Sequence, residues 1–448
     1  MRADRFFLAT GLLFGAVLAL VTPPFQVPDE PAHFYRAYMV SEGRLVRSDP
    51  GRDTGEVLPA SLPAVTRGFY PEIPFHEERK VAPAAVLAAL RVPLEPKRRE
   101  FVYFPNTLAY TAVPYLPQAV AMTVGRLAGA PVLALLYLGR FAGLLTGVFL
   151  IHAALRRLPA FRWLAALIAL TPMALFLRSG LTADTVTLAA GFLLAAAVAR
   201  LAWGEGPGRR SDVALMIVAA AILCLSKPVY VPLALTALAI PASRFPGGRR
   251  LPILLLHLSV TSGAFLLAAA NARLSDAPVH PGLESPDRQL QVVLEEPGRV
   301  LRIVAVDYAV HAPRYLTQLV GKLGWLDVEL PPPFLLAYLG MLAMLLVLDA
   351  NPLVRVSLGQ RALLAIATVA TLGAISVSIY VLWTPYRADF LESPQGRYFL
   401  PLLPAAAWIF HAPRLADRVR PERLGLALAL FSILSFAISL WAILERYY

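Results

Sequence analysis

Two adjacent carboxylates, Asp29 and Glu30, stand where an apolar N-terminal segment gives way to a polar one. Pro31 suits the first turn of a helix, where a missing backbone N–H costs nothing. The carboxylates would then lie at a helix N-terminus, where the macrodipole favours negative charge, with His33 and Arg36 on the same face as Asp29. A carboxylate placed there can act as a general base towards an attacking hydroxyl. The alternative is a capped helix with a solvated face.

Further polar side chains occur at three later turns between apolar segments. They are Arg178 and Asp184, then Lys227, and finally Arg387, Asp389, Glu392, Gln395, Arg397 and Tyr398. Cations can hold a phosphate or pyrophosphate group and stabilise it as it leaves. An inverting transfer from such a group needs only one catalytic carboxylate, because phosphate leaves without strong protonation. These residue types therefore predict transfer of a phosphate-linked group to a hydroxyl.

Each of these residues also has a structural interpretation. Arg178 and Lys227 could extend to phospholipid headgroups. Asp184 could cap the helix that follows it, and Arg397 could pair with Glu392. Aromatic residues near the same turns could contact sugar C–H groups or form an interfacial belt; they are Tyr35, Tyr38, Trp325, Trp383, Tyr386 and Tyr398.

The composition is that of a multi-pass membrane protein. Of the 448 residues, 58% are hydrophobic and 16% are charged, whereas soluble proteins are nearer half apolar and a quarter charged. The net charge of +12 is better explained by arginine-rich cytoplasmic loops than by nucleic-acid binding. The single cysteine, Cys224, excludes an intrachain disulfide and CxxC metal chemistry.

Apolar segments predict an all-α integral membrane protein with about 11 transmembrane helices. The candidate spans are 6–22, 131–155, 161–178, 183–203, 212–226, 229–243, 251–271, 333–349, 361–383, 398–411 and 424–444. The first resembles a signal peptide without a cleavage site, so we expect an uncleaved span.

The arginines predict a topology with the N-terminus in the cytoplasm. Each short arginine-rich loop, including those with Arg156, Arg209 and Arg414–Arg420, then lies on the cytoplasmic side. This requires residues 104–128 to lie along the outer leaflet rather than cross it. External loops then cover about 25–130 and about 272–332, the second with a helical middle from 289 to 324. We expect one membrane domain over 1–448 and no separate soluble domain.

Four stretches, in chain order, resemble a family of bacterial multi-pass membrane proteins long described as a domain of unknown function. They are Pro-Asp-Glu-Pro-Ala-His-Phe-Tyr-Arg-Ala-Tyr at 28–38, Ser-Gly-Leu-Thr-Ala-Asp at 179–184, Leu-Ser-Lys-Pro at 225–228 and Pro-Gln-Gly-Arg-Tyr-Phe-Leu-Pro-Leu-Leu-Pro at 394–404. That family is similar to the GT-C glycosyltransferases. The resemblance implies a GT-C-like fold, with a long first external loop that carries juxtamembrane helices.

The resemblance also implies an inverting membrane glycosyltransferase. It would move a sugar from a polyprenyl-phosphate donor to an acceptor hydroxyl on the outer face of the bacterial cytoplasmic membrane. The acidic first-loop residue, usually the base, maps onto Asp29 with Glu30 beside it, and the basic residues carry over as Arg178, Lys227 and Arg397. The partners would be the lipid-linked sugar, a glycan, lipid or protein acceptor, and membrane lipids, without nucleic acid.

Metal dependence is open at this level, although some GT-C enzymes use a divalent ion. Asp29, Glu30, His33 and Asp184 could supply ligands, but adjacent Asp-Glu is not a diagnostic spacing. We therefore expect no required cofactor.

Two other function classes fit the composition. A lipid-linked glycan flippase or another transporter would place charges near the bilayer midplane, on broken helices. Here the charges collect at the external ends of spans, and no internal repeat is visible. The third possibility is a non-catalytic scaffold in envelope polysaccharide assembly, which would tolerate neutralisation of Asp29 and Lys227.

Overall fold

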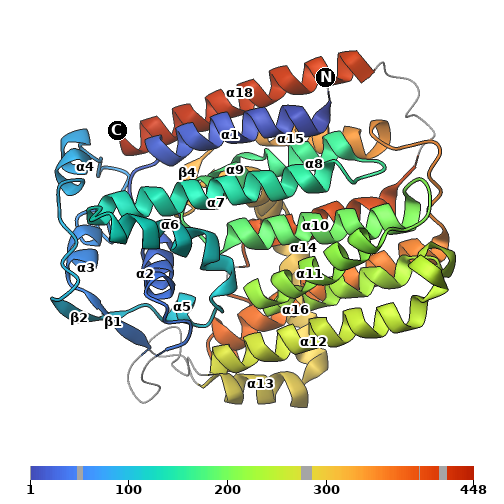
Figure 1. Ribbon diagram of the computed structural model, residues 1–448, viewed down its shortest axis with the longest axis horizontal. Coiled ribbons are helices and arrows are strands. Elements are labelled where there is room, and N and C mark those ends of the chain that lie inside the picture. Colours follow the sequence, from blue (N-terminus) through green and yellow to red (C-terminus); the bar gives the residue numbers. More distant parts are fainter. Residues whose placement is uncertain (1, 48–53, 274–284, 393, 413–420) are drawn as a thin grey trace.

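The computed structural model describes residues 2–47, 54–273, 285–392, 394–412 and 421–448. It is built from helices, with two small two-stranded antiparallel sheets, so the predicted all-α membrane architecture is confirmed (Figure 1). Some of the predictions concern positions outside the described residues. These positions are the arginines at 414, 418 and 420, which were expected on the cytoplasmic side, and residues 48–53 and 274–284 of the two expected external loops.

Six helices in the described part of the chain are long and apolar enough to cross a membrane. They are α1 (Ala3–Val21), α7 (Val132–Leu155), α10 (Asp184–Trp203), α12 (Arg250–Arg273), α16 (Leu358–Leu382) and α18 (Pro421–Tyr447). A seventh span is possible if α8 (Arg162–Ala169) and α9 (Pro172–Ser179), which meet at a 57° bend, cross together.

The expected number of about 11 spans is not confirmed, because several apolar segments form shorter elements. These are α11 (Arg210–Ser226), the 3₁₀ helix η2 (Pro228–Ala239), α15 (Pro332–Leu348), and the run of η5 (Gly396–Leu402), α17 (Leu403–Ala406) and η6 (Ala407–Phe410). Two further short 3₁₀ turns are η3 (Ala242–Arg244) and η4 (Pro246–Gly248). Proline explains much of the difference: Pro232 lies inside η2 and Pro401 inside η5, where each removes a backbone donor and disfavours a continuous α-helix.

The segment between α1 and α7 lies at one end of the helical bundle (Figure 1). It contains α2 (Glu30–Ser41), α3 (Ser61–Thr66), α4 (Pro83–Ala89), α5 (Pro105–Leu108), η1 (Val113–Tyr115), α6 (Leu116–Leu127), and the paired strands β1 (Gly55–Pro59) and β2 (Arg99–Tyr103). Residues 104–128 thus form three short helices rather than one span. Their position along a membrane surface stays a prediction.

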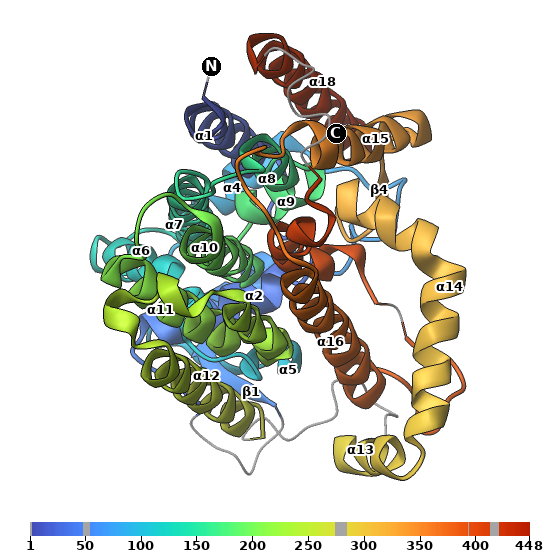
Figure 2. The same cartoon turned by 90° about the vertical axis from the view of Figure 1, so that its right-hand side faces the viewer.

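The second expected external loop has the helical middle that the sequence predicts. It consists of α13 (Pro286–Glu295) and α14 (Pro297–Gly321), followed by the paired strands β3 (Lys322–Leu323) and β4 (Val328–Glu329). Figure 2 shows α13 and α14 along one flank, with α16 between α14 and α12.

The centre of the bundle is α10, of which nearly every residue is buried. Gly191 allows η5 to pack directly against it, because a Cβ atom there would lie 2.4 Å from the carbonyl oxygen of Pro401. This close approach brings the start of η5 towards the N-terminus of α10. Those two ends carry Arg397 and Asp184.

Candidate active site

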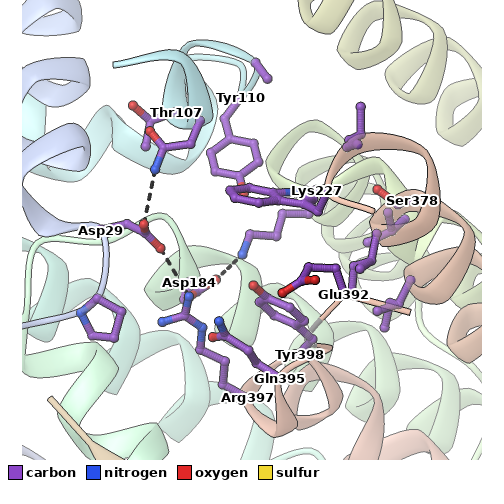
Figure 3. A pocket seen from close by; sticks show the side chains of 18 of the residues that line it. Asp29, Thr107, Tyr110, Asp184, Lys227, Ser378, Glu392, Gln395, Arg397 and Tyr398 are labelled. Carbon is purple, nitrogen blue, oxygen red and sulfur yellow. Dashed lines mark hydrogen bonds and ion pairs between the residues drawn. The ribbon is translucent and has the colours of Figure 1, made fainter. Parts of the chain in front are cut away.

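A cavity of about 790 Å³ lies where the loops meet the ends of α10, α12 and α16. Its lining includes Asp29, His33, Asn106, Tyr110, Asp184, Lys227, Gln318, Trp325, Ile379, Glu392, Gln395, Arg397 and Tyr398. Figure 3 shows that the charged groups of Asp29, Asp184, Lys227 and Arg397 enter the cavity from separate elements and point towards one another.

Asp29 is held by its backbone and by two side chains. It immediately precedes α2, which begins at Glu30 as predicted, and its φ of 60° is left-handed, a conformation that Asp adopts more readily than most residues. Asn106 Nδ2 donates to Oδ1 at 3.1 Å, and Arg397 Nη2 donates to Oδ2 at 3.2 Å. The Asp29 side chain remains 33% exposed, so its oxygens stay accessible from the cavity.

Lys227 and Asp184 form an ion pair across the turns that precede η2 and α10. Burial by itself would lower the pKa of Lys227, but the Asp184 carboxylate outweighs it, so the pKa is raised and the ammonium stays charged. The rings of Tyr110 and Tyr398 lie on either side, with each centroid 5.4 Å from Nζ. The side chain of Lys227 is only 12% exposed and faces Asp184, which does not fit an extension to headgroups. Asp184 pairs with Lys227 rather than capping α10.

Arg397 reaches the cavity from η5 and pairs with Asp29 rather than with Glu392. Its side chain is 6% exposed, and its Nε and Nη1 have no hydrogen-bond partner among the described residues. Gln395 Oε1 is likewise buried without a partner in the described ranges. Buried donors and acceptors without partners are costly, so these groups are suited to receive a polar ligand.

His33 lines the cavity from α2 in an uncharged form. Its Nδ1 lies 2.7 Å from the hydroxyl oxygen of Tyr115. Burial lowers the pKa of His33 to about 4, an effect that the nearby carboxylates of Asp29 and Asp184 only partly offset. At neutral pH the ring is therefore a hydrogen-bonding group and adds no positive charge.

Glu30 does not line the cavity; it forms a fully buried ion pair with Arg140 of α7. Arg140 Nε and Nη2 donate to its two carboxylate oxygens at 2.7 and 2.6 Å. The backbone N–H groups of Phe25 and Leu181 donate to the same carboxylate, both at 2.9 Å. The other N–H groups of Arg140 donate to the carbonyls of Ala19, Thr22 and Pro23. We call Glu30 and Arg140 the buried clamp.

The buried clamp connects the two backbone segments that carry the cavity carboxylates. Glu30 follows Asp29 directly, and Leu181 stands three residues before Asp184. The same guanidinium also holds the end of α1. The clamp therefore sets the relative positions of Asp29 and Asp184 without facing the cavity itself.

Arg36 and Arg178 also lie outside the cavity lining. Arg36 donates from Nη2 to the carbonyls of Leu45 and Tyr110, at 2.8 and 3.0 Å, and so holds the Tyr110 loop beside Lys227. Arg178 is fully buried in α9, donates to the carbonyl of Ala169, and lies over the ring of Phe7. Of the ten expected site residues, the structure gathers Asp29, His33, Asp184, Lys227, Gln395, Arg397 and Tyr398.

The sequence analysis missed Arg140 and Asn106. Arg140 had a usable signal, since a lone arginine within an apolar span is expensive and marks a buried partner. Asn106 had a weaker one, as a single amide beside Pro105 in an apolar segment. Neither signal identifies the partner, which lies 110 residues away for Arg140 and 77 for Asn106.

Among the described residues, no three His, Cys, Asp or Glu side chains are grouped so that they could hold a metal ion. The expectation that no metal is required stays a prediction.

The chain belongs to the family described as "Predicted membrane protein (DUF2142)", whose sequence model matches residues 12–406. The predicted membership of a multi-pass family of undefined function is thereby confirmed. No curated protein matches significantly. A crystal structure of ArnT from Cupriavidus metallidurans, bound to undecaprenyl phosphate, is similar at 15% sequence identity and a TM-score of 0.39. The similarity covers 96% of this chain, which spans 62% of that ArnT chain.

Proposed function

We propose that this protein is an inverting glycosyltransferase that moves a sugar from a polyprenyl-phosphate donor to an acceptor hydroxyl. One observation carries the proposal: an accessible carboxylate, Asp29, shares a cavity with two largely buried cations, Lys227 and Arg397. A base and two anion-binding groups are the minimum equipment for displacement of a phosphate by a hydroxyl.

The reaction would proceed by a single displacement. The acceptor oxygen attacks the anomeric carbon while its proton passes to Asp29, and the bond from that carbon to the phosphate oxygen breaks. The electron pair leaves with the polyprenyl phosphate. The ammonium of Lys227 would bind that phosphate as its negative charge increases, together with the Arg397 N–H groups that have no hydrogen-bond partner among the described residues.

The wall of the cavity suits a lipid-borne donor. Ile375, Ile379 and Leu382 line it from α16 and Ala272 from the end of α12, and both helices are candidate spans. A lipid chain could therefore lie among apolar side chains while its phosphate reaches Lys227. Undecaprenyl phosphate, the ligand in the ArnT structure, belongs to this class, but the proposal rests on the cavity of this chain. We place the cavity on the outer face of the cytoplasmic membrane.

Product analysis with detergent-solubilised protein tests the proposal. Purified protein is incubated with undecaprenyl-phosphate-linked hexoses and pentoses and with candidate acceptors, and release of undecaprenyl phosphate and formation of the glycoside are followed by mass spectrometry. We expect release with at least one donor. Transport of a lipid-linked glycan in sealed proteoliposomes, without any transfer in detergent, would instead establish a transporter. If the protein keeps its cellular function after both Asp29 and Lys227 are neutralised, the result would favour a non-catalytic scaffold.

A further inference from the structure

The cavity has a second wall, which is aromatic and comes from loops rather than spans. Phe75 belongs to the segment between α3 and α4, and Trp325 and Leu326 connect β3 with β4. None of these residues lies in a helix that could cross a membrane. This wall therefore comes from different elements than the apolar wall of α12 and α16, and Asp29 lines the same cavity.

The Trp325 indole is fixed as a flat surface. Its Nε1 donates to the carbonyl of Phe25 at 3.1 Å, and its backbone N–H donates to Asp327 Oδ1 at 2.9 Å. The ring stacks on Tyr70 with centroids 5.0 Å apart and planes 21° apart, and Phe75 meets it edge-on at 6.3 Å. Because the indole N–H is already used, Trp325 offers a ligand its aromatic surface and no hydrogen bond.

Phe75 is exposed although the surrounding backbone is firmly held. Its side chain is 69% exposed, and its φ of 64° is left-handed, which is rare for an aromatic residue. Its N–H donates to Asp327 Oδ2 at 3.2 Å, and that carboxylate also forms a buried pair with Arg446 of α18 at 2.9 Å. Arg446 donates in turn to the carbonyl of Ile73 at 2.8 Å. The structure thus keeps the apolar ring of Phe75 exposed at the lining of the cavity.

Amide groups line the same cavity as these rings. Gln318 Oε1 accepts from the backbone N–H of Gly396 at 3.0 Å, which fixes the side chain. Gln395 Oε1 is buried and has no partner within the described ranges. A sugar ring presents C–H groups on its faces and hydroxyls around its edge, so it matches an aromatic surface bordered by amides.

We propose that Trp325 and Phe75 form the acceptor subsite, here called the aromatic shelf, and that the acceptor is a saccharide. The role of the site as an acceptor subsite rests on the proposed function. The binding of a saccharide at these residues does not depend on that function. The donor lipid would enter along α12 and α16, which leaves the loop side for the second substrate. A lipid acceptor would need apolar surface from a span, and the shelf has none.

Saturation-transfer difference NMR tests the shelf without any turnover. The probes are the methyl α- and β-glycosides of glucose, galactose, mannose, rhamnose and arabinose, mixed with purified full-length protein without lipid donor. We expect at least one glycoside to give ring-proton signals. Its affinity should fall about threefold to tenfold in Trp325→Ala, the range of an aromatic contact. Trp325→Phe should keep most of the affinity, and Phe75→Ala should weaken it without a folding cost, because Phe75 is exposed.

Trp441→Ala is the matched control, since Trp441 is 57% exposed on α18 and does not line the cavity. The shelf is excluded if no glycoside in the panel binds, or if Trp325→Ala binds like the unmodified protein. Equal loss in Trp441→Ala also excludes it. Failure of the two proposals is distinguishable. Saccharide binding without sugar transfer would contradict the glycosyltransferase proposal but support the aromatic shelf. Sugar transfer with an unchanged acceptor KM in Trp325→Ala would contradict only the aromatic shelf.

Discussion

Asp29 and Glu30 are neighbours in the chain, but their carboxylates enter two different regions of the molecule. That of Asp29 lies in the cavity, one third exposed, and accepts hydrogen bonds from Asn106 and Arg397. That of Glu30 lies in the buried clamp, fully enclosed, and accepts from Arg140 and two backbone N–H groups. The left-handed backbone at Asp29 turns the two side chains apart.

The difference shows how a pair of acidic residues can divide its work. An accessible carboxylate with few partners can exchange a proton with a substrate, whereas one enclosed by charge-assisted hydrogen bonds cannot do so without leaving a buried cation unpaired. The clamp in turn holds the backbone on both sides of the cavity. We therefore assign the chemistry to Asp29 and a positioning role to Glu30. Four predictions test this division.

The largest effect is expected on the cavity side. Asp29→Asn keeps the size of the side chain and one of its two acceptor oxygens but removes the base, so kcat for sugar transfer should fall by about 10²- to 10⁴-fold. Loss of the ion pair with Arg397 should lower the melting temperature, so kcat is compared at a temperature at which both proteins remain folded. The matched control is Asp389→Asn, because Asp389 is an exposed partner of Arg299 and lies outside the cavity lining; its activity should be normal. Full activity in Asp29→Asn would remove the assigned base.

Substitutions in the buried clamp should lower the free energy of unfolding. Arg140→Met leaves Glu30 buried without its cation, which should cost about 3–5 kcal/mol of folding free energy. Thermal denaturation in detergent would measure the loss. The double variant Glu30→Gln/Arg140→Met should recover part of it, because no unpaired charge remains. Glu100→Gln, at an exposed pair with Arg67, should change stability by only about 0.5 kcal/mol. A Glu30→Gln variant with unchanged stability and unchanged activity would contradict the positioning role.

The pH dependence of stability in a His33 variant tests whether water reaches the side of α2 that faces the cavity. Because burial lowers its pKa to about 4, the folded protein stays unprotonated where the unfolded chain, with a histidine pKa near 6.5, takes up a proton. Stability should therefore fall as the pH falls from about 6.5 to about 4, by up to about 3 kcal/mol. Melting curves across this range should show a shallower decline in His33→Gln. An identical decline would mean that water reaches the ring.

The smallest effect is expected for Lys227, measured as ligand affinity. In Lys227→Gln we expect affinity for undecaprenyl phosphate to fall about tenfold to hundredfold, the value of a hydrogen bond to a charged group. Native mass spectrometry can report the bound fraction. Lys97→Gln is the matched control, because Lys97 is exposed in the first loop. Equal loss in both variants would indicate a general charge effect rather than a phosphate site.

Local sequence rules predicted several features correctly. Pro31 marked the start of α2, the helical middle of the second loop formed α13 and α14, and the hydropathy indicated a membrane protein of helices. The number of spans was not predictable in the same way. A proline-containing apolar segment such as η2 has the composition of a span, and only its hydrogen bonding shows that it is a 3₁₀ helix.

The sequence alone determined the chemical types at this site: a carboxylate before a helix, cations at short turns, and aromatic residues beside them. Tertiary structure decided which of them meet. Arg397 contacts Asp29, which is 368 residues away in the sequence. Arg178, which the sequence also predicted at a turn near the site, is buried in α9 outside the cavity lining. The physical reason is that the direction of a side chain depends on how its element packs. That packing follows from distant contacts, such as Gly191 against Pro401 and Arg140 against Glu30, which no local pattern encodes.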